Sequence, residues 1–452
     1  MKNLFLTLFC GVAGAFASHA AVHDITAYGA VADTTRLSTS AIQRAIDACN
    51  AAGGGEVLVP AGDWKTGSIF LKSNVTLRLE NGATLYGSTD IRDYVPVKTN
   101  YVSLRTHTPT IQLIYADKAR SVAITGQGTI DGRGAAFPKL TWDDEGITRP
   151  HLLRFIQCSD ITVSGITLRN SGCWMQHYLA CDRLKIQGIT VYNRNNYNND
   201  ALDLDGCHDV VVSDMIADSD DDAITLKSTS PRLCEDITIS NCTVSSHCNG
   251  IKLGTETNGG FRNIIIRGVT VKPSADQSTQ FFGYDGGIGH SAISLEIVDG
   301  GTMTNVDIAD ITIRGTQCPI FIRLANRARA YSPDVPVENI GSISGIRLHD
   351  ILIDDAGPGG SSITGLAGHP VRDVELRDIT IRHAGGQPET PAPTDEKAAD
   401  YPESTMWGIL PAQGFWLNHT DGVRISNLRV IPATPDARPA ILATDSPNLI
   451  QE

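Results

Sequence analysis

The chain has 452 residues, a formal net charge of −13, 19% charged residues, 6% aromatic residues and 43 glycines. The acidic balance argues against a nucleic-acid-binding protein, because phosphate binding needs a clustered basic surface. The high glycine and low aromatic content disfavour a helical bundle and a disordered chain, and favour a turn-rich β protein.

Residues 1–20 read as a secretory signal peptide. Lys2 is followed by an apolar stretch from Leu4 to Phe16, and the small residues Ser18 and Ala20 stand where cleavage would occur. The apolar stretch is shorter than the roughly 20 residues of a membrane-spanning helix. We therefore expect an exported protein, secreted or periplasmic, with no membrane anchor.

A single helix is expected near the start of the remaining chain, in the stretch "STSAIQRAIDACNAAGGG" from residue 38. Ser38 or Ser40 can cap it, its apolar residues have helical spacing, and the glycines at 53–55 end it. Such a helix could cover the open end of a stack of strands and protect its edges.

A repeated phrase then dominates the chain. It reads "CSDITVSGI" from Cys158, "CDRLKIQGI" from Cys181, "CHDVVVSDM" from Cys207, "CEDITISNC" from Cys234 and "FRNIIIRGV" from Phe261, at spacings of 23, 26, 27 and 27 residues. Apolar and polar residues alternate with the period of a strand. Looser copies begin at residues 303, 343, 371 and 420, and earlier coils begin near 74 and 121.

Units of this length cannot bury their own apolar face and must stack. The pattern predicts an all-β, right-handed parallel β-helix with an N-terminal capping helix. Leucine-rich repeats are disfavoured because their leucine and asparagine positions are missing. We expect residues 21–452 to form one such domain, and we expect a monomer.

Nine cysteines remain beyond residue 20, so at least one thiol is unpaired. Four of them open successive repeats at the same position. Stacked buried thiols are therefore at least as good an interpretation as disulfide bridges.

Acidic residues recur at the spacing of one coil. Asp200 precedes Asp221 by 21 residues, and Asp220, Asp221 and Asp222 are consecutive. Neighbouring coils lie roughly 4.8 Å apart, so these carboxylates should meet on one surface and raise one another's pKa. A turn role, in which the side chain bonds to its own backbone, is the favoured interpretation for the remaining acids of this region. Those acids are Asp203, Asp205, Asp214 and Asp218.

These residues resemble the polygalacturonase and rhamnogalacturonase group of glycoside hydrolases, family 28. The resemblance covers most of the chain and includes "AYGAVADTT", "GQGTIDGRG" and "LRNSGCWMQH". Its most specific part is "NND", ending at Asp200, followed by the aspartate pair of "DDAI". It implies inverting hydrolysis in which Asp221 is the general acid and Asp200 and Asp222 activate water. It implies no cofactor and no metal ion, although adjacent coils alone would suggest the shorter carboxyl separation of retaining enzymes.

Two family motifs are altered. The Gly-His-Gly motif stands here as "CNG", with Asn249 in place of the histidine and His247 two residues earlier; the Arg-Ile-Lys motif falls near residues 294–296, which offer no cation. Replacement charge for a uronate-containing poly- or oligosaccharide could come from Lys227, Lys252, Arg323, Arg327 and Arg329, on successive coils. We expect His247 and Asn249 to bind substrate as well.

Sugar rings also need flat apolar surfaces, and Tyr284 and Trp407 lie in irregular segments where exposure is expected. The long segments around them could close one end of the cleft and make the enzyme act on chain ends. Further candidate platforms, for which core packing is the alternative, are Trp174, Tyr197, Phe281, Phe282, Tyr401 and Trp416.

Two other functions stay open from the sequence. A polysaccharide lyase could use the same fold, with aspartates holding Ca²⁺ and Lys252 or Arg323 abstracting a proton. A noncatalytic carbohydrate-binding solenoid would need none of these groups for chemistry. The mass and ultraviolet absorbance of any product would separate the three.

Overall fold

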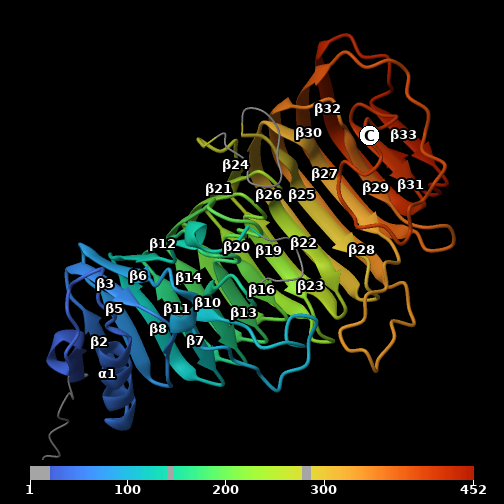
Figure 1. Cartoon of the computed structure of the whole chain (residues 1–452). Coiled ribbons are helices and arrows are strands. Elements are labelled where there is room, and N and C mark those ends of the chain that lie inside the picture. Colours follow the sequence, from blue (N-terminus) through green and yellow to red (C-terminus); the bar gives the residue numbers. More distant parts are fainter. Residues whose placement is uncertain (1–20, 140–145, 277–286) are drawn as a thin grey trace, which may run out of the picture.

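The computed structural model describes residues 21–139, 146–276 and 287–452, so the expected signal peptide at 1–20 lies outside the described residues. Figure 1 shows the coils stacked along one axis from the N-terminal to the C-terminal end, with helix α1 (Thr39–Ala51) at the first end. The molecule is a right-handed parallel β-helix, as the repeats predicted. No helix among the described residues has the length and apolar character needed to cross a membrane.

Each central coil adds one strand to a small sheet and two strands to a large one. The coil after residue 150, for example, runs through β10, β11 and β12, which pair with β13, β14 and β15 of the next coil. All pairings between strands are parallel. In stacking order, the small sheet consists of β4 (Ile69–Phe70), β7 (Gln112–Asp117), β10 (His151–Ile156), β13 (Gln176–Leu179), β16 (Asp203–Asp205), β19 (Ile224–Ser228), β22 (Asn249–Thr257), β25 (Gly289–Ile297), β27 (Thr316–Leu324), β29 (Ser361–Thr364), β31 (Phe415–Asn418) and β33 (Ile441–Thr444).

The large sheet forms the remaining walls of the solenoid. In chain order, its strands are β1 (Ala21–Asp24), β2 (Gly55–Val59), β3 (Gly62–Thr66), β5 (Val75–Leu79), β6 (Ala83–Gly87), β8 (Arg120–Gly126), β9 (Thr129–Asp131), β11 (Ser159–Ser164), β12 (Thr167–Arg169), β14 (Asp182–Gln187), β15 (Thr190–Asn193), β17 (His208–Ser213), β18 (Ile216–Ser219), β20 (Cys234–Ser240), β21 (Thr243–Ser246), β23 (Gly260–Arg267), β24 (Thr270–Val271), β26 (Thr302–Arg314), β28 (Ser342–Ala356), β30 (Val371–Gly385), β32 (Thr420–Thr434) and β34 (Ile450–Gln451). Short 3-10 helices are η1 (Ile25–Tyr28), η2 (Ile91–Asp93) and η3 (Gly134–Ala136).

The register explains the repeated phrase. Val163 pairs with Ile186, and Val212, Ile239 and Ile266 continue the same row in the next three coils. All five side chains are fully buried, so the alternating apolar residues point into one continuous core. The period of two therefore places every second residue of these strands inside the solenoid.

The turns of the ladder use residues that tolerate left-handed backbone. Asp214 and Asn241 occupy equivalent corners of neighbouring coils with φ near 57° and 54°, and Gly188 fills the corner before them. Asn, Asp and Gly are the residues that adopt this conformation most readily. Asp214 thus lies at a turn of the ladder, which agrees with the position expected for it.

All nine cysteines of the described chain are free and buried. Cys181 lies in the core and its thiol is within hydrogen-bonding distance of the carbonyls of Phe155 and Leu179. Cys158, Cys207 and Cys234 occupy the same position of their own coils. Stacked thiols, rather than bridges, are therefore the correct interpretation of the cysteine pattern.

Helix α1 packs its buried face on the first coils, through residues that include Ile42, Ile46 and Cys49. Ser38 is its N-cap residue, but its hydroxyl makes no capping hydrogen bond and instead lies 3.2 Å from the carbonyl oxygen of Val31. The capping helix is thus present with Ser38 as its N-cap residue, as expected, but without a capping hydrogen bond from the serine side chain.

Candidate active site

The predicted acidic residues lie where the chain enters two neighbouring strands of the small sheet. Asp200 comes just before β16, and Asp221 and Asp222 come just before β19. The two coils are joined directly, since the backbone N–H of Ala201 donates to the carbonyl of Asp222 over 2.9 Å. All three aspartates are at least nine-tenths buried. The spacing of one coil therefore brings these carboxylates together, as expected.

Asp220, the first residue of the triplet, has a different role. Its carboxylate is 2.9 Å from His247 Nδ1 and 3.9 Å from the guanidinium of Arg194, and all three groups are buried. Asp220 is thus held inside the wall of the solenoid. His247 has no exposed surface, so its position does not support the expected contact with substrate.

Asp222 is held by two donors from the next coil. The Nδ2 of Asn249 donates to its Oδ1 over 2.7 Å, and Nζ of Lys252 lies 3.0 Å from its Oδ2. Asn249 is itself held, since its Oδ1 accepts from the hydroxyl of Ser291. A carboxylate that faces an ammonium group and an amide donor is stabilised in its ionised form. Asn249 and Lys252 therefore both reach the cluster, and both act on Asp222.

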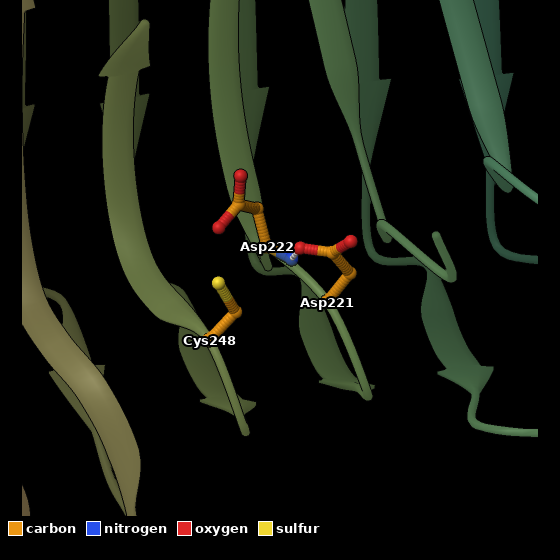
Figure 2. Close-up of side chains that lie close together, drawn as sticks. All are labelled: Asp221, Asp222 and Cys248. Carbon is orange, nitrogen blue, oxygen red and sulfur yellow. Dashed lines mark hydrogen bonds between the residues drawn. The ribbon is translucent and has the colours of Figure 1, made fainter. Parts of the chain in front are cut away.

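Asp221 has the opposite environment. Burial, and after it the negative charge of Asp222, raises the pKa of Asp221 to about 7. The backbone N–H of Asp222 donates to Asp221 Oδ1 over 3.0 Å, and Figure 2 shows the two side chains next to each other at the start of β19. Adjacent residues in the chain thus form a pair in which one carboxyl group has a raised pKa and the other is held by an amide and an ammonium group.

Asp200 and Asp203 complete the acidic cluster. Lys227 joins them, with Nζ 3.9 Å from Asp200 Oδ2, 3.6 Å from Asp203 Oδ1 and 3.5 Å from Glu256 Oε2. Burial and the neighbouring carboxylates raise the pKa of Asp200 and of Asp203 well above the ordinary value. Oδ1 of Asp200 and both carboxyl oxygens of Asp203 are buried without a hydrogen-bond partner. These oxygens are free to accept a proton or a hydrogen bond from a ligand.

The turn interpretation of Asp203 is therefore wrong. Asp203 and Asp205 lie in β16, where Leu202 and Leu204 face the core and the aspartates face outward. Asp205 accepts from the backbone N–H of Thr229 over 2.9 Å. The alternation of Leu and Asp in "ALDLD" could have indicated that Asp203 and Asp205 point away from the core.

A second acid that the sequence analysis passed over is Glu296. It is fully buried, and burial raises its pKa to about 8, although Lys252 nearby opposes the shift. The hydroxyl of Ser294 donates to its Oε1 over 2.6 Å, and its Oε2 has no hydrogen-bond partner. Residues 294–296, where the family motif supplies cations, thus supply a carboxyl group that tends to stay protonated.

Among the described residues, Arg323 and Arg327 form no ion pair with the aspartates of this cluster, although the charge of Arg327 helps to lower the pKa of Glu256. Arg323 is buried, donates to the carbonyl of Gly365 over 3.2 Å and lies 5.0 Å from the ring of Trp407. Arg327 pairs with Asp299 and donates to a backbone carbonyl. Arg323 and Trp407 are therefore part of the packing of the later coils. Tyr284 lies outside the described residues.

One group in this cluster has the composition of a metal site. Ligand atoms of Asp221, Asp222 and Cys248 lie within 4.8 Å of one another (Figure 2). Both oxygens of Asp222 are already engaged by Asn249 and by the positively charged Lys252. Burial also raises the pKa of the Cys248 thiol, which opposes the thiolate form that binds metals. The arrangement fits proton transfer better than cation binding.

Two arginines lie next to the cluster, and one of them, Arg105, was not predicted from the sequence. Arg105 and Arg329 both lie 2.5 Å from Glu256 Oε1, the carboxylate that Lys227 also approaches. Arg105 belongs to a nonrepetitive segment, so no ladder position predicted it. Trp174, which was only one of several aromatic candidates, has its ring centre 4.8 Å from Lys227 Nζ.

Comparison with known proteins gives consistent results. The family model described as "Glycosyl hydrolases family 28" matches residues 49–390. A "Probable polygalacturonase" of Vitis vinifera is 27% identical over 86% of this chain and 80% of that protein. An "Exo-poly-alpha-D-galacturonosidase" of Dickeya chrysanthemi is 40% identical over 33% of this chain and 25% of that protein.

Solved structures share the fold. The family 28 exopolygalacturonase of Yersinia enterocolitica superimposes with a TM-score of 0.72 at 18% identity, covering 95% of this chain and 78% of that one. The exopolygalacturonase of Thermotoga maritima gives a TM-score of 0.66 at 21% identity, covering 80% and 87% of the two chains.

Proposed function

Since this chain belongs to the glycosyl hydrolases of family 28, we propose that it hydrolyses the glycosidic bonds of a pectic, galacturonate-containing chain and inverts the anomeric carbon. The observation that carries the mechanism is the pair formed by Asp221, with its pKa raised to about 7, and Asp222, held beside Lys252. One carboxyl group can give a proton at a pH at which its neighbour can accept one.

The proposed reaction takes one step. Asp221 donates its proton to the glycosidic oxygen as the bond from that oxygen to the anomeric carbon breaks. Asp222, with Asp200 beside it, accepts a proton from a water molecule whose oxygen forms the new bond on the opposite face of the sugar. The leaving sugar gains a hydroxyl hydrogen, and proton exchange with solvent restores both carboxyl groups.

The substrate class is supported by charge and by likeness. Lys227 and Lys252 lie on neighbouring coils within the acidic cluster, where an ammonium group can also meet a uronate carboxylate. The names of the relatives from Vitis vinifera and Dickeya chrysanthemi both refer to galacturonate polymers. We further propose that residues 1–20 direct export, which would bring the enzyme to such polymers.

The test is digestion of polygalacturonate followed by product analysis. We expect every cut to add the mass of one water molecule, and NMR to show first-formed sugar of the anomeric configuration opposite to that of the substrate. Unsaturated products that absorb in the near ultraviolet and vanish with a chelator would instead indicate a lyase. First-formed sugar with the substrate's configuration would contradict inversion.

A matched pair of variants tests the role of Asp221. Asp221→Asn should lower kcat by at least about 100-fold, because general acid catalysis contributes roughly 10² to 10⁴ in rate. Asp214→Asn makes the same change at an exposed turn that asparagine tolerates, and its activity should stay unchanged. Full activity of Asp221→Asn would show that Asp221 is not the general acid.

A further inference from the structure

A partly open cavity lies beside the acidic cluster, on the side of the N-terminal coils. It has a volume of about 170 Å³, and it is lined mainly by cationic and aromatic groups. A cavity of about 150 Å³ can hold a six-membered ring such as benzene, so one sugar ring is of the right order of size. The lining residues that matter here are Arg105, His151, Arg154, Trp174, His177 and Arg329.

Arg154 is the decisive residue of this cavity. Its side chain is 1% exposed, and its guanidinium donates to the hydroxyl of Thr110 and, over 2.7 Å, to the carbonyl of Arg105. No carboxylate of the described chain forms an ion pair with it, and its Nε has no hydrogen-bond partner. A buried charge without a counter-ion is costly. An anionic ligand in the cavity would remove that cost.

Three arginine side chains line the cavity, and the carboxylates that act on the lining residues are Glu256 and Asp205, the latter 3.1 Å from His177 Nε2. Arg105 and Arg329 share one carboxylate, Glu256, with Lys227. Burial lowers the pKa of His177 to about 4 and that of His151 well below its ordinary value, so neither ring needs a counter-ion. The Nδ1 atoms of both histidines are buried without a hydrogen-bond partner and can bond to a hydroxyl group.

The cavity lies close to the acidic cluster. Trp174 connects the two, with its ring centre 4.8 Å from Arg105 Cζ on one side and 4.8 Å from Lys227 Nζ on the other. His177 is in β13, one coil before β16 and two coils before β19. At roughly 4.8 Å per coil, the cavity is about 5 to 10 Å from the aspartates along the stack. That distance is on the scale of one sugar unit.

A crossing segment, residues 94–111, closes this side of the site. It leaves the early coils after η2 and reaches across the outer face of the small sheet before entering β7. Leu104 N–H donates to the carbonyl of Thr229 over 2.8 Å, and the hydroxyl of Tyr101 is 2.8 Å from that of Ser230. The segment is thus fixed to the strand that follows Asp221 and Asp222. Leu104, Arg105, His107, Thr108 and Thr110 of this segment also line the cavity, so the segment forms its wall on this side.

We propose that this cavity is a subsite for the terminal uronate unit of the substrate, with its carboxylate paired to Arg154, and that the enzyme consequently cleaves next to a chain end. The proposal rests on the proposed hydrolysis of a galacturonate chain and adds to it a residue that determines specificity. It gives the unpaired arginine its counter-ion and gives the two histidines partners among the sugar hydroxyl groups.

The first experiment measures binding without turnover. Calorimetry should detect D-galacturonate binding to the wild-type enzyme and no binding of D-galactose, which lacks the carboxylate. Arg154→Gln should weaken galacturonate binding by about 10- to 100-fold, the loss expected for a hydrogen-bonded charge pair. Arg183→Gln, at a surface arginine of β14 paired with Asp160, is the matched control and should bind normally. Equal binding of galacturonate by Arg154→Gln would overturn the subsite.

The second experiment follows the products of the wild-type enzyme, so its outcome does not depend on whether Arg154→Gln folds correctly. Wild-type enzyme should release one short product of constant length from the start, and oligomers with a neutral terminal sugar should be poor substrates. Arg154→Lys keeps the charge but loses the planar fork, so its kcat/KM for the acidic oligomer should lie between those of wild type and Arg154→Gln. Mixed oligomers in the earliest samples would overturn the subsite even if hydrolysis is confirmed. Arg154-dependent binding without any hydrolysis would instead refute only the proposed reaction.

Discussion

At the scale of single residues, the triplet Asp220, Asp221 and Asp222 shows how environment separates identical side chains. Asp220 faces His247, Asp222 faces Lys252, and Asp221 forms no ion pair within the described residues. The repulsion within the triplet is therefore relieved by different partners, and Asp221 retains its proton most readily. The spacing of one coil predicted the meeting with Asp200, but not these directions, because they depend on side chains from the next coil.

The first prediction concerns pH. The proposed acid must be protonated, so kcat/KM should fall as pH rises through about 7, the pKa of Asp221. The same shift affects stability: between the ordinary value of 3.8 and about 7, folded protein holds a proton that unfolded protein has lost, so this contribution to stability declines as pH rises. Initial rates and chemical denaturation across the range measure both effects. If kcat/KM did not fall between pH 7 and about pH 9, the assignment of Asp221 as the acid would be contradicted.

The second prediction concerns Lys252. Its ammonium group is 3.0 Å from Asp222, so Lys252→Met should leave a buried carboxyl group without its cation and lower the free energy of unfolding by about 3 to 5 kcal/mol, measured by chemical denaturation. Lys185→Met, at an exposed site of β14, is the control. A rise in KM with an unchanged free energy of unfolding would mean that Lys252 contacts substrate, as the sequence suggested, rather than holding Asp222.

At the scale of elements, β23 offers a test of the ladder within three consecutive isoleucines. Ile264 and Ile266 are fully buried, whereas Ile265 between them is 41% exposed. Ile266→Ala should lower the free energy of unfolding by about 2 to 5 kcal/mol, through lost burial and a cavity. Ile265→Ala should change it by about 0.5 kcal/mol or less. Urea denaturation measures both, and equal losses would contradict the inward and outward alternation.

The elements also show what could be predicted from sequence. Strands of the ladder were predictable because each repeat must bury the same alternate positions, as Val212 and Ile239 do. The crossing segment was not, because its position depends on single contacts such as that of Leu104 with Thr229, 125 residues later. Helix α1 was predicted with its correct buried face and with Ser38 as a candidate N-cap residue. The absence of a capping hydrogen bond was not predictable, since the hydroxyl group of Ser38 contacts the carbonyl of Val31 instead.

At the scale of the whole molecule, the core carries a column of thiols instead of cross-links. Protein beginning at residue 21 should titrate nine thiols after denaturation and react very slowly when native, because all nine side chains are buried. It should also migrate identically on denaturing gels with and without reductant. Fewer than nine titratable thiols in freshly denatured, unoxidised protein would contradict the free-thiol arrangement.

The crossing segment has a mechanical consequence for the entire solenoid. In a stack whose repeats contact only their neighbours, coils can detach one at a time from either end. Here Tyr101 and Leu104 tie the third coil to residues that follow β19. A force that peels those later coils must also break the tie, so this stretch should come away as one cooperative block. The pocket rich in acids and arginines would thereby be shielded from the fraying that the ends undergo.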